Sequence, residues 1–104
     1  MREVDLDSFA AAHEHGATVI DVREPMEYLD GHVPGARLIP MGQLPGRLDE
    51  IDADAPVYVV CASGNRSGAM AAVLHGAGFE AVNVRGGTKG WIASGRAVNC
   101  GREA

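Results

Sequence analysis

The sequence has few of the features that mark disulfide-rich, metal-binding and membrane-spanning proteins. Only two of its 104 residues are cysteines, Cys61 and Cys100, which are too few for a disulfide framework and lack the spacing of a metal site. No stretch approaches the roughly 20 apolar residues of a membrane span. Acidic residues interrupt the apolar residues near the N-terminus, so no signal peptide is expected. These absences predict a cytoplasmic protein without a metal site.

Positive charge is also scarce. There are 9 basic residues against 14 acidic ones, which gives a net charge of −5. This balance argues against general binding to nucleic acid or to an anionic membrane. It leaves room for a small anionic substrate, because a local cradle can oppose the global charge.

Apolar residues, by contrast, make up 46% of the chain, which is enough for a core without disulfides. The length predicts one domain, placed at residues 1–98, with a polar tail at residues 99–104. Apolar segments alternate with helix-like ones, as in βα units. We therefore expect an α/β fold whose five-stranded, mainly parallel sheet is flanked by helices on both faces. The expected strands lie within 2–4, 17–23, 32–40, 56–61 and 80–86, and the expected helices within 6–15, 24–31, 44–51 and 66–78, followed by a last turn or helix at 86–95.

The fourth expected strand leads directly into Cys61, at the sheet edge where open α/β folds bind their ligands. The residues that follow are small and precede a helix, so the chain can curl and aim several backbone N–H groups at one point. Gly64 can take a positive φ without steric cost. Such a loop stabilises a thiolate, so we predict that Cys61 is an exposed nucleophile. The predicted substrate cradle consists of Ala62, Ser63, Gly64, Asn65 and Arg66.

The proposed thiolate sets an energetic requirement. An ordinary cysteine, with a pKa of about 8.5, is only about 3% ionised at pH 7. A helix dipole contributes about 0.3–1 kcal/mol, which is too little to make the thiolate predominate. Several N–H···S hydrogen bonds, helped by Arg66, would have to supply the rest. The alternative is a buried, inert cysteine that simply ends a core strand, since free cysteines are often buried.

Three segments resemble the rhodanese-homology domain, a sulfurtransferase module. "DVREPMEYLDGHVPGARLIP" is similar to the first signature segment of that family, "CASGNRS" to its active-site loop, and "GGTKGW" to its closing Gly-Gly-x-x-x-Trp segment. The resemblance extends from about residue 2 to about residue 98. It implies a five-stranded parallel sheet flanked by helices, which agrees with the alternation described above.

The resemblance also implies a thiosulfate sulfurtransferase-like activity. The Cys61 thiolate would take the outer sulfur of a donor, thiosulfate or a persulfide, and hold it as a persulfide. A thiol, or cyanide in the test tube, would then accept the sulfur. The implied partners are a small sulfur donor and a thiol acceptor, with a protein persulfide as one candidate. No metal or organic cofactor is required.

Glu27 departs from the family pattern. In the two-domain thiosulfate enzymes of this family, an arginine that binds the sulfonate of the donor lies near the corresponding position. A glutamate there would repel a dianion. The departure favours a persulfide over thiosulfate as the physiological donor.

Two other functions stay open. One is a non-catalytic module that keeps this fold for protein docking. The other is a cysteine-dependent phosphatase or arsenate reductase, whose loops resemble Cys-x5-Arg. Only four residues separate Cys61 from Arg66, and the narrower ring suits sulfur better than a tetrahedral phosphoryl group.

Several residues around the loop have two interpretations. Asp21, Arg23 and Glu27 follow the second strand, and an ion pair of Arg23 with Glu27, four residues apart, would either lie beside the pocket as part of the site or, as we favour, be a structural brace for the loop. Arg66 either contacts the donor or binds an acidic side chain. Ser67 either donates to the sulfur or caps the helix, and capping is favoured. Cys100 either resolves a Cys61 persulfide or, as we favour, is an exposed bystander in a mobile tail.

Overall fold

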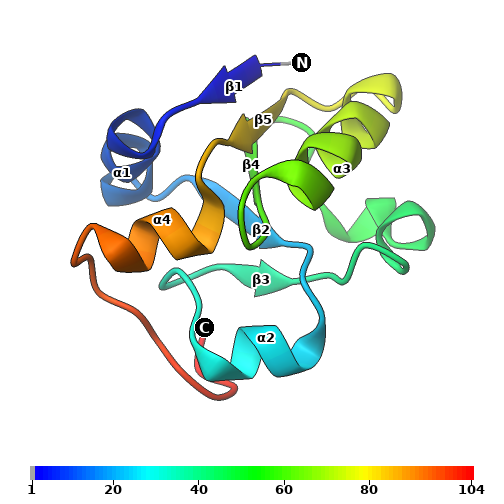
Figure 1. Ribbon diagram of the computed structural model, residues 1–104. Coiled ribbons are helices and arrows are strands. Elements are labelled where there is room, and N and C mark those ends of the chain that lie inside the picture. The colour runs from blue at the N-terminus through cyan, green and yellow to red at the C-terminus, as the bar shows by residue number, and fades with distance from the viewer. Residues whose placement is uncertain (1) are drawn as a thin grey trace.

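The computed structural model describes residues 2–104. Five strands form one sheet in the order β1-β5-β4-β2-β3, and every adjacent pair is parallel (Figure 1). This confirms the expected α/β fold. The strands are β1 (Arg2–Val4), β2 (Thr18–Asp21), β3 (Arg37–Leu38), β4 (Val57–Val60) and β5 (Ala81–Val84).

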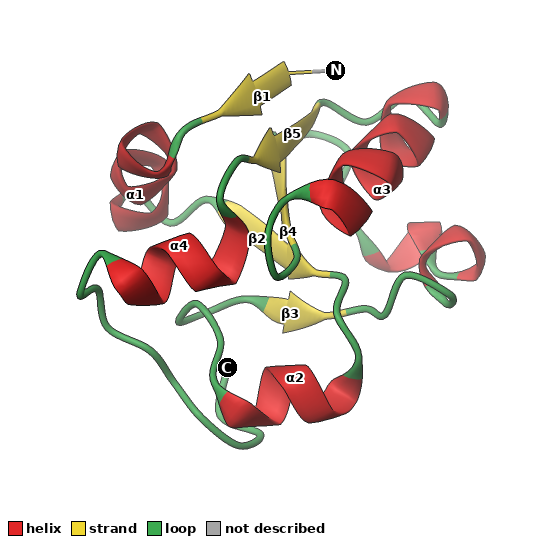
Figure 2. Cartoon of the chain, in the orientation of Figure 1, coloured by secondary structure: helices red, strands yellow, loops and turns green. Residues whose placement is uncertain are grey.

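Helices cover both faces of the sheet (Figure 2). The helix α3 packs on one face, and α1 and α4 pack on the other, with α2 beside the edge strand β3. Local signals set two of the helix starts. The Asp5 carboxylate accepts a hydrogen bond from the Ser8 amide (2.8 Å) and caps α1, while Pro25 opens α2. The helices are α1 (Leu6–Glu14), α2 (Pro25–Asp30), α3 (Asn65–Gly76) and α4 (Gly87–Ala93).

The central strands are apolar on both faces because each face has its own core. On the α3 face, Met70 and Leu74 pack in a cluster with strand residues such as Val59. On the other face, the rings of Phe9 and Trp91 meet edge to face, 5.4 Å apart. The two cores pack on opposite faces of β4 in the middle of the sheet, and Cys61 directly follows this strand.

The segment 44–51, expected to be one helix, instead forms two 3₁₀ turns, Leu44–Gly46 and Leu48–Glu50. The chain breaks at Arg47, whose φ of −127° and ψ of 24° lie outside the helical region. The Arg47 guanidinium is bonded to Gln43 and Glu50, which stabilises this broken conformation. None of the helices in residues 2–104 is both long and apolar enough to cross a membrane.

The tail after residue 98, expected to be mobile, instead packs along α2. Asn99 and His32 exchange two backbone hydrogen bonds (2.8 and 3.0 Å), and the Gly101 amide donates to the Leu29 carbonyl (2.8 Å). His32 is fully buried, stacks on Tyr28 and hydrogen-bonds the Glu103 carbonyl. The tail is therefore bound to the domain through backbone hydrogen bonds and a buried histidine.

Candidate active site

Cys61 lies directly after β4, but its side chain is not exposed as expected. Only 1% of the residue is accessible, and it belongs to the apolar cluster under α3. Burial alone would agree with the inert cysteine considered above. The polar contacts of the sulfur are the second observation that bears on the choice between the two interpretations.

The loop after Cys61 directs hydrogen-bond donors at its sulfur. The Gly64 amide donates to Sγ over 3.0 Å. Burial acts to raise the pKa of the Cys61 thiol, but hydrogen bonding with Ser67 and with the amides of Gly64 and Ser63 outweighs it, so the pKa lies below its ordinary value. The sulfur is thus buried and also surrounded by groups that favour the thiolate.

Two glycines allow the loop to take this shape. Gly64 precedes α3 with a φ of +112°, a conformation that other residues rarely adopt. Gly87 opens α4 with a φ of +58°, and a Cβ there would lie 2.6 Å from the Cys61 carbonyl oxygen. The close approach lets the first turn of α4 bind the loop. The amide of Thr88 donates to the Cys61 carbonyl (2.8 Å), and that of Lys89 donates to the Ala62 carbonyl (3.0 Å).

Ser67 does not cap α3, contrary to the favoured interpretation, because the helix has already begun at Asn65. Its hydroxyl is buried and lies 3.3 Å from Cys61 Sγ and 2.6 Å from Asn83 Oδ1. Asn83, on β5, in turn donates to the Gly64 carbonyl (3.2 Å) and to Glu3 Oε2 on β1 (2.9 Å). A chain of hydrogen bonds therefore runs from the sulfur to the edge of the sheet.

Arg66 binds Glu27 through two parallel hydrogen bonds of 2.7 and 2.9 Å. Hydrogen bonding from Arg66 lowers the pKa of Glu27 from 4.5 to about 2, although burial opposes the shift. The same hydrogen bonds raise the pKa of Arg66. This pair replaces the expected ion pair between Arg23 and Glu27.

Arg23 instead binds Asp21, two residues before it. The Arg23 guanidinium donates to both carboxylate oxygens of Asp21 (2.8–3.1 Å) and also to the Gly31 carbonyl (2.8 Å). Both side chains are buried, and the pair connects the end of β2 to the end of α2. Its contacts are those of a structural brace.

A pocket of about 200 Å³ opens beside the loop. Its walls mix positive and negative side chains with the apolar side chain of Ile92. A larger hollow, of about 580 Å³, lies between α2, β3 and the tail, away from the cysteine loop. The smaller pocket is the relevant one because Ala62 forms part of its wall. Its lining consists of Arg23, Glu27, Asp30, Gly31, Ala62, Thr88, Lys89 and Ile92.

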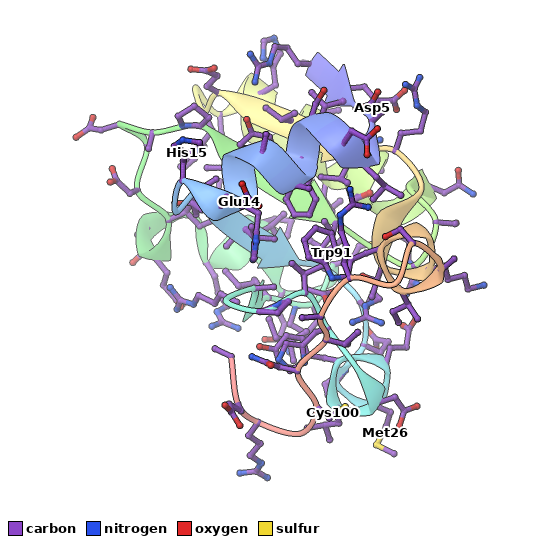
Figure 3. The ribbon with its side chains drawn as sticks, turned by 90° about the vertical axis from the view of Figure 1, so that its left-hand side faces the viewer. Asp5, Glu14, His15, Met26, Trp91 and Cys100 are labelled. Atoms are coloured by element: carbon purple, nitrogen blue, oxygen red, sulfur yellow. The ribbon has the colours of Figure 1, made fainter. Side chains whose placement is uncertain are left out.

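Cys100 lies on the surface beside α2, on the same side as Met26 (Figure 3). Its sulfur is 3.5 Å from the Asp30 carbonyl oxygen. Sequence reasoning missed Asn83, Gly87 and Thr88 as parts of the site. Asn83 carried a signal, because it is a lone amide within the apolar strand "AVNV". Thr88 carried no comparable signal, since its contact with the loop depends on the fold.

The chain matches the rhodanese-like domain family over residues 5–94. It belongs to this family.

Relatives of this rhodanese-like domain agree with the assignment. It is 44% identical over 92 residues to an uncharacterized Bacillus subtilis protein, YqhL, covering 88% of this chain and 72% of the relative. It is 40% identical over 82 residues to the thiosulfate sulfurtransferase GlpE of Pseudomonas putida, covering 78% and 74%. A rhodanese-related protein of Thermoplasma volcanium has the same fold, with a TM-score of 0.90, 32% identity and coverage of 95% and 98%.

Proposed function

We propose that this chain is a sulfurtransferase that carries sulfane sulfur on Cys61 as a persulfide. The observation that carries the proposal is the 3.0 Å hydrogen bond from the Gly64 amide to Cys61 Sγ, at the carboxyl end of a central parallel strand. Membership of the rhodanese-like family and the similarity to a named sulfurtransferase support it. Amides around the sulfur favour its anion, and the anion is the nucleophile.

The reaction needs no outside oxidant or cofactor. The Cys61 thiol first loses its proton to solvent. The thiolate then attacks the outer sulfur of the donor, so that a sulfur–sulfur bond to Cys61 forms while the bond within the donor breaks. The bonding electron pair leaves with sulfite when the donor is thiosulfate, or with a thiolate when it is a persulfide. An acceptor thiolate takes the outer sulfur in the same way, and Cys61 returns as a thiolate.

Because Cys61 is buried, a sulfur donor can reach it only after the loop moves. With 1% of the residue accessible, the loop has to open for the outer sulfur of a donor to reach Sγ. The pocket walled by Ala62 and the first turn of α4 is the entry that we propose. The amides of Ser63, Gly64 and Ser67 would hold the persulfide as they hold the thiolate.

We further propose that the preferred donor is a persulfide of a small thiol or a protein. A sulfonate dianion is bound best by a free guanidinium. Here the Arg66 guanidinium is ion-paired with Glu27, and the Arg23 guanidinium is ion-paired with Asp21. Asp30 adds another carboxylate to the pocket. A cytoplasmic location fits this proposal, because both cysteines are free and reduced thiols persist in that compartment.

A thiocyanate assay tests the activity. Thiosulfate, the donor in the name of the Pseudomonas putida relative, and a persulfide donor are each mixed with cyanide and the protein. We expect thiocyanate from both, with a higher kcat/KM for the persulfide. Cys61→Ser should abolish it, while Cys100→Ser, the matched control, should retain it. Glu27→Gln should raise kcat/KM for thiosulfate selectively, because it frees Arg66.

The thiocyanate assay also tests the docking module, and a separate phosphatase assay tests the third function. The burial of Cys61 is the observation that favours a docking module, and such a module would give no thiocyanate from either donor. A phosphatase or arsenate reductase needs its arginine aimed at the centre of the loop. Here Arg66 is engaged by Glu27, so we expect no phosphatase turnover.

A further inference from the structure

Asn83 occupies an unusual position for an amide. It is 3% exposed, and its neighbours in β5 are Val82 and Val84. Its side chain meets three polar groups, Glu3 Oε2, the Gly64 carbonyl and the Ser67 hydroxyl. Carboxylate and carbonyl oxygens only accept hydrogen bonds, so the NH₂ group of Asn83 has to face them. The amide oxygen is thereby fixed toward Ser67.

The Ser67 hydroxyl faces two possible acceptors but has one hydrogen. Asn83 Oδ1 lies 2.6 Å from Ser67 Oγ, whereas Cys61 Sγ lies 3.3 Å away. The amide oxygen is a stronger acceptor than a thiol sulfur, and the shorter contact is that of a well-formed O–H···O bond. The hydrogen therefore lies between Ser67 and Asn83, and a lone pair of Ser67 faces the sulfur.

We propose that Asn83 is a positioning residue that holds the Ser67 hydrogen away from Cys61, so that Ser67 offers the resting sulfur an acceptor and not a donor. In this state the Cys61 S–H donates to Ser67 Oγ. After ionisation, Ser67 can turn its hydrogen to the sulfur only by giving up its bond to Asn83. The thiolate therefore gains less from Ser67 than it would from a free hydroxyl, and the loop amides carry the stabilisation. Asn83 thus restrains thiolate formation before a donor arrives.

Charged groups also lie around the loop. From α3, Arg66 favours the thiolate, while Glu27 from α2 offsets it through their ion pair. The variants used below alter none of these charges. A difference between their alkylation midpoints therefore reflects the hydrogen bonding of the Ser67 hydroxyl. The other charged groups nearby are Asp21 at the end of β2, Arg23 after that strand, Lys89 on α4, and Glu3 behind Asn83.

The test measures ionisation of Cys61 and requires no turnover. The rate of alkylation by iodoacetamide is followed against pH in a Cys100→Ser background, so that Cys61 is the one thiol. Four proteins are compared: the parent, Asn83→Ala, Ser67→Ala and the double variant. Asn83→Ala frees the Ser67 hydrogen for the sulfur and should lower the midpoint of the profile by about one pH unit, a tenfold change in the ionisation constant. Circular dichroism confirms that each variant is folded.

The Ser67→Ala variant shows whether the Ser67 hydroxyl raises or lowers the pH midpoint of Cys61 alkylation. Because it removes an acceptor and not a donor, we expect the midpoint to stay or fall. In its absence Asn83→Ala should have no further effect, since no hydroxyl remains to be redirected. A rise of the midpoint in Ser67→Ala would overturn the proposal, and this variant alone decides if Asn83→Ala does not fold. An Asn83→Ala shift that persists without Ser67 would also overturn it, because Asn83 would then act through Gly64.

The proposed role of Asn83 rests on the proposed function of Cys61, but separate results would contradict each of them. A protein that shows these shifts and accepts no sulfur contradicts the proposed function alone. A protein that transfers sulfur and shows the opposite shifts contradicts the role of Asn83 alone.

Discussion

At the residue scale, Gly87 is the position where the geometry of the loop tolerates least change. A Cβ there would lie 2.6 Å from the Cys61 carbonyl oxygen and 2.7 Å from that of Ala62, in addition to the strain of a positive φ. Gly95, with a φ of +81° and open space around its Cβ position, has the strain without the clash. Substitution of the two glycines therefore separates the effect of backbone strain from that of the steric clash.

We predict that Gly95→Ala lowers the free energy of unfolding by about 1 kcal/mol, and that Gly87→Ala lowers it at least twice as much. Urea denaturation measures both values. Equal losses in the two variants would contradict the close approach of α4 to the cysteine loop at Gly87.

The Arg66–Glu27 pair predicts a pH dependence. Hydrogen bonding from Arg66 holds the pKa of Glu27 at about 2 in the folded chain, below the ordinary 4.5. The pair therefore stabilises the fold above pH 4.5, and this contribution is lost as the pH falls toward 2. Both side chains are about a third exposed, so solvent screening limits the effect to about 1 kcal/mol or less.

Denaturation at a series of acidic pH values, with Glu27→Gln as the comparison, measures this contribution. The parent protein should lose stability more steeply than the variant as the solution is acidified. Parallel curves for the two proteins would mean that the ion pair does not stabilise the fold.

At the element scale, the first turn of α4 supports the loop between β4 and α3. The first amides of a helix have no partner within the helix. Those of Thr88 and Lys89 instead donate to the Cys61 and Ala62 carbonyls. We predict slow hydrogen exchange at both amides, compared with the first-turn amide of Asp7, an exposed residue of α1. NMR exchange rates provide the measurement, and exchange as fast as at Asp7 would contradict the docking of α4 on the loop.

The elements themselves were predictable where local pattern decides them. Apolar strands alternating with helix-like segments indicated the parallel sheet and the helices α1, α2 and α3. Residues 86–95, which contain α4, were expected to form either a turn or a helix. The segment 44–51 was not predictable, because its break depends on how Arg47 bonds to neighbouring side chains. The candidate nucleophile followed from its place after a strand. The partners of Arg23, Arg66 and Ser67 did not follow, because each choice depends on which side chains the fold brings within reach.

At the scale of the whole molecule, the packed tail joins the second half of the domain to α2. Removal of residues 99–104 would expose the buried His32 and delete the hydrogen bonds from Asn99 and Gly101. We predict that this truncation lowers the free energy of unfolding by about 1–2 kcal/mol, which for a domain of this size lowers Tm by roughly 4–16 °C. Thermal denaturation measures it, with full-length Cys100→Ser as the control. An unchanged Tm would place the tail outside the folding unit.

The fold places the Cys61 sulfur at the carboxyl end of a central strand, next to the amides of the following loop. The central claim is that this sulfur accepts and carries sulfane sulfur. Intact-protein mass spectrometry after treatment with a small-molecule persulfide tests it most directly, in the Cys100→Ser background. We predict a gain of one sulfur atom, located on Cys61, that is lost on addition of cyanide and absent in Cys61→Ser. An unchanged mass in the folded protein, or a gain that persists in Cys61→Ser, would contradict the account.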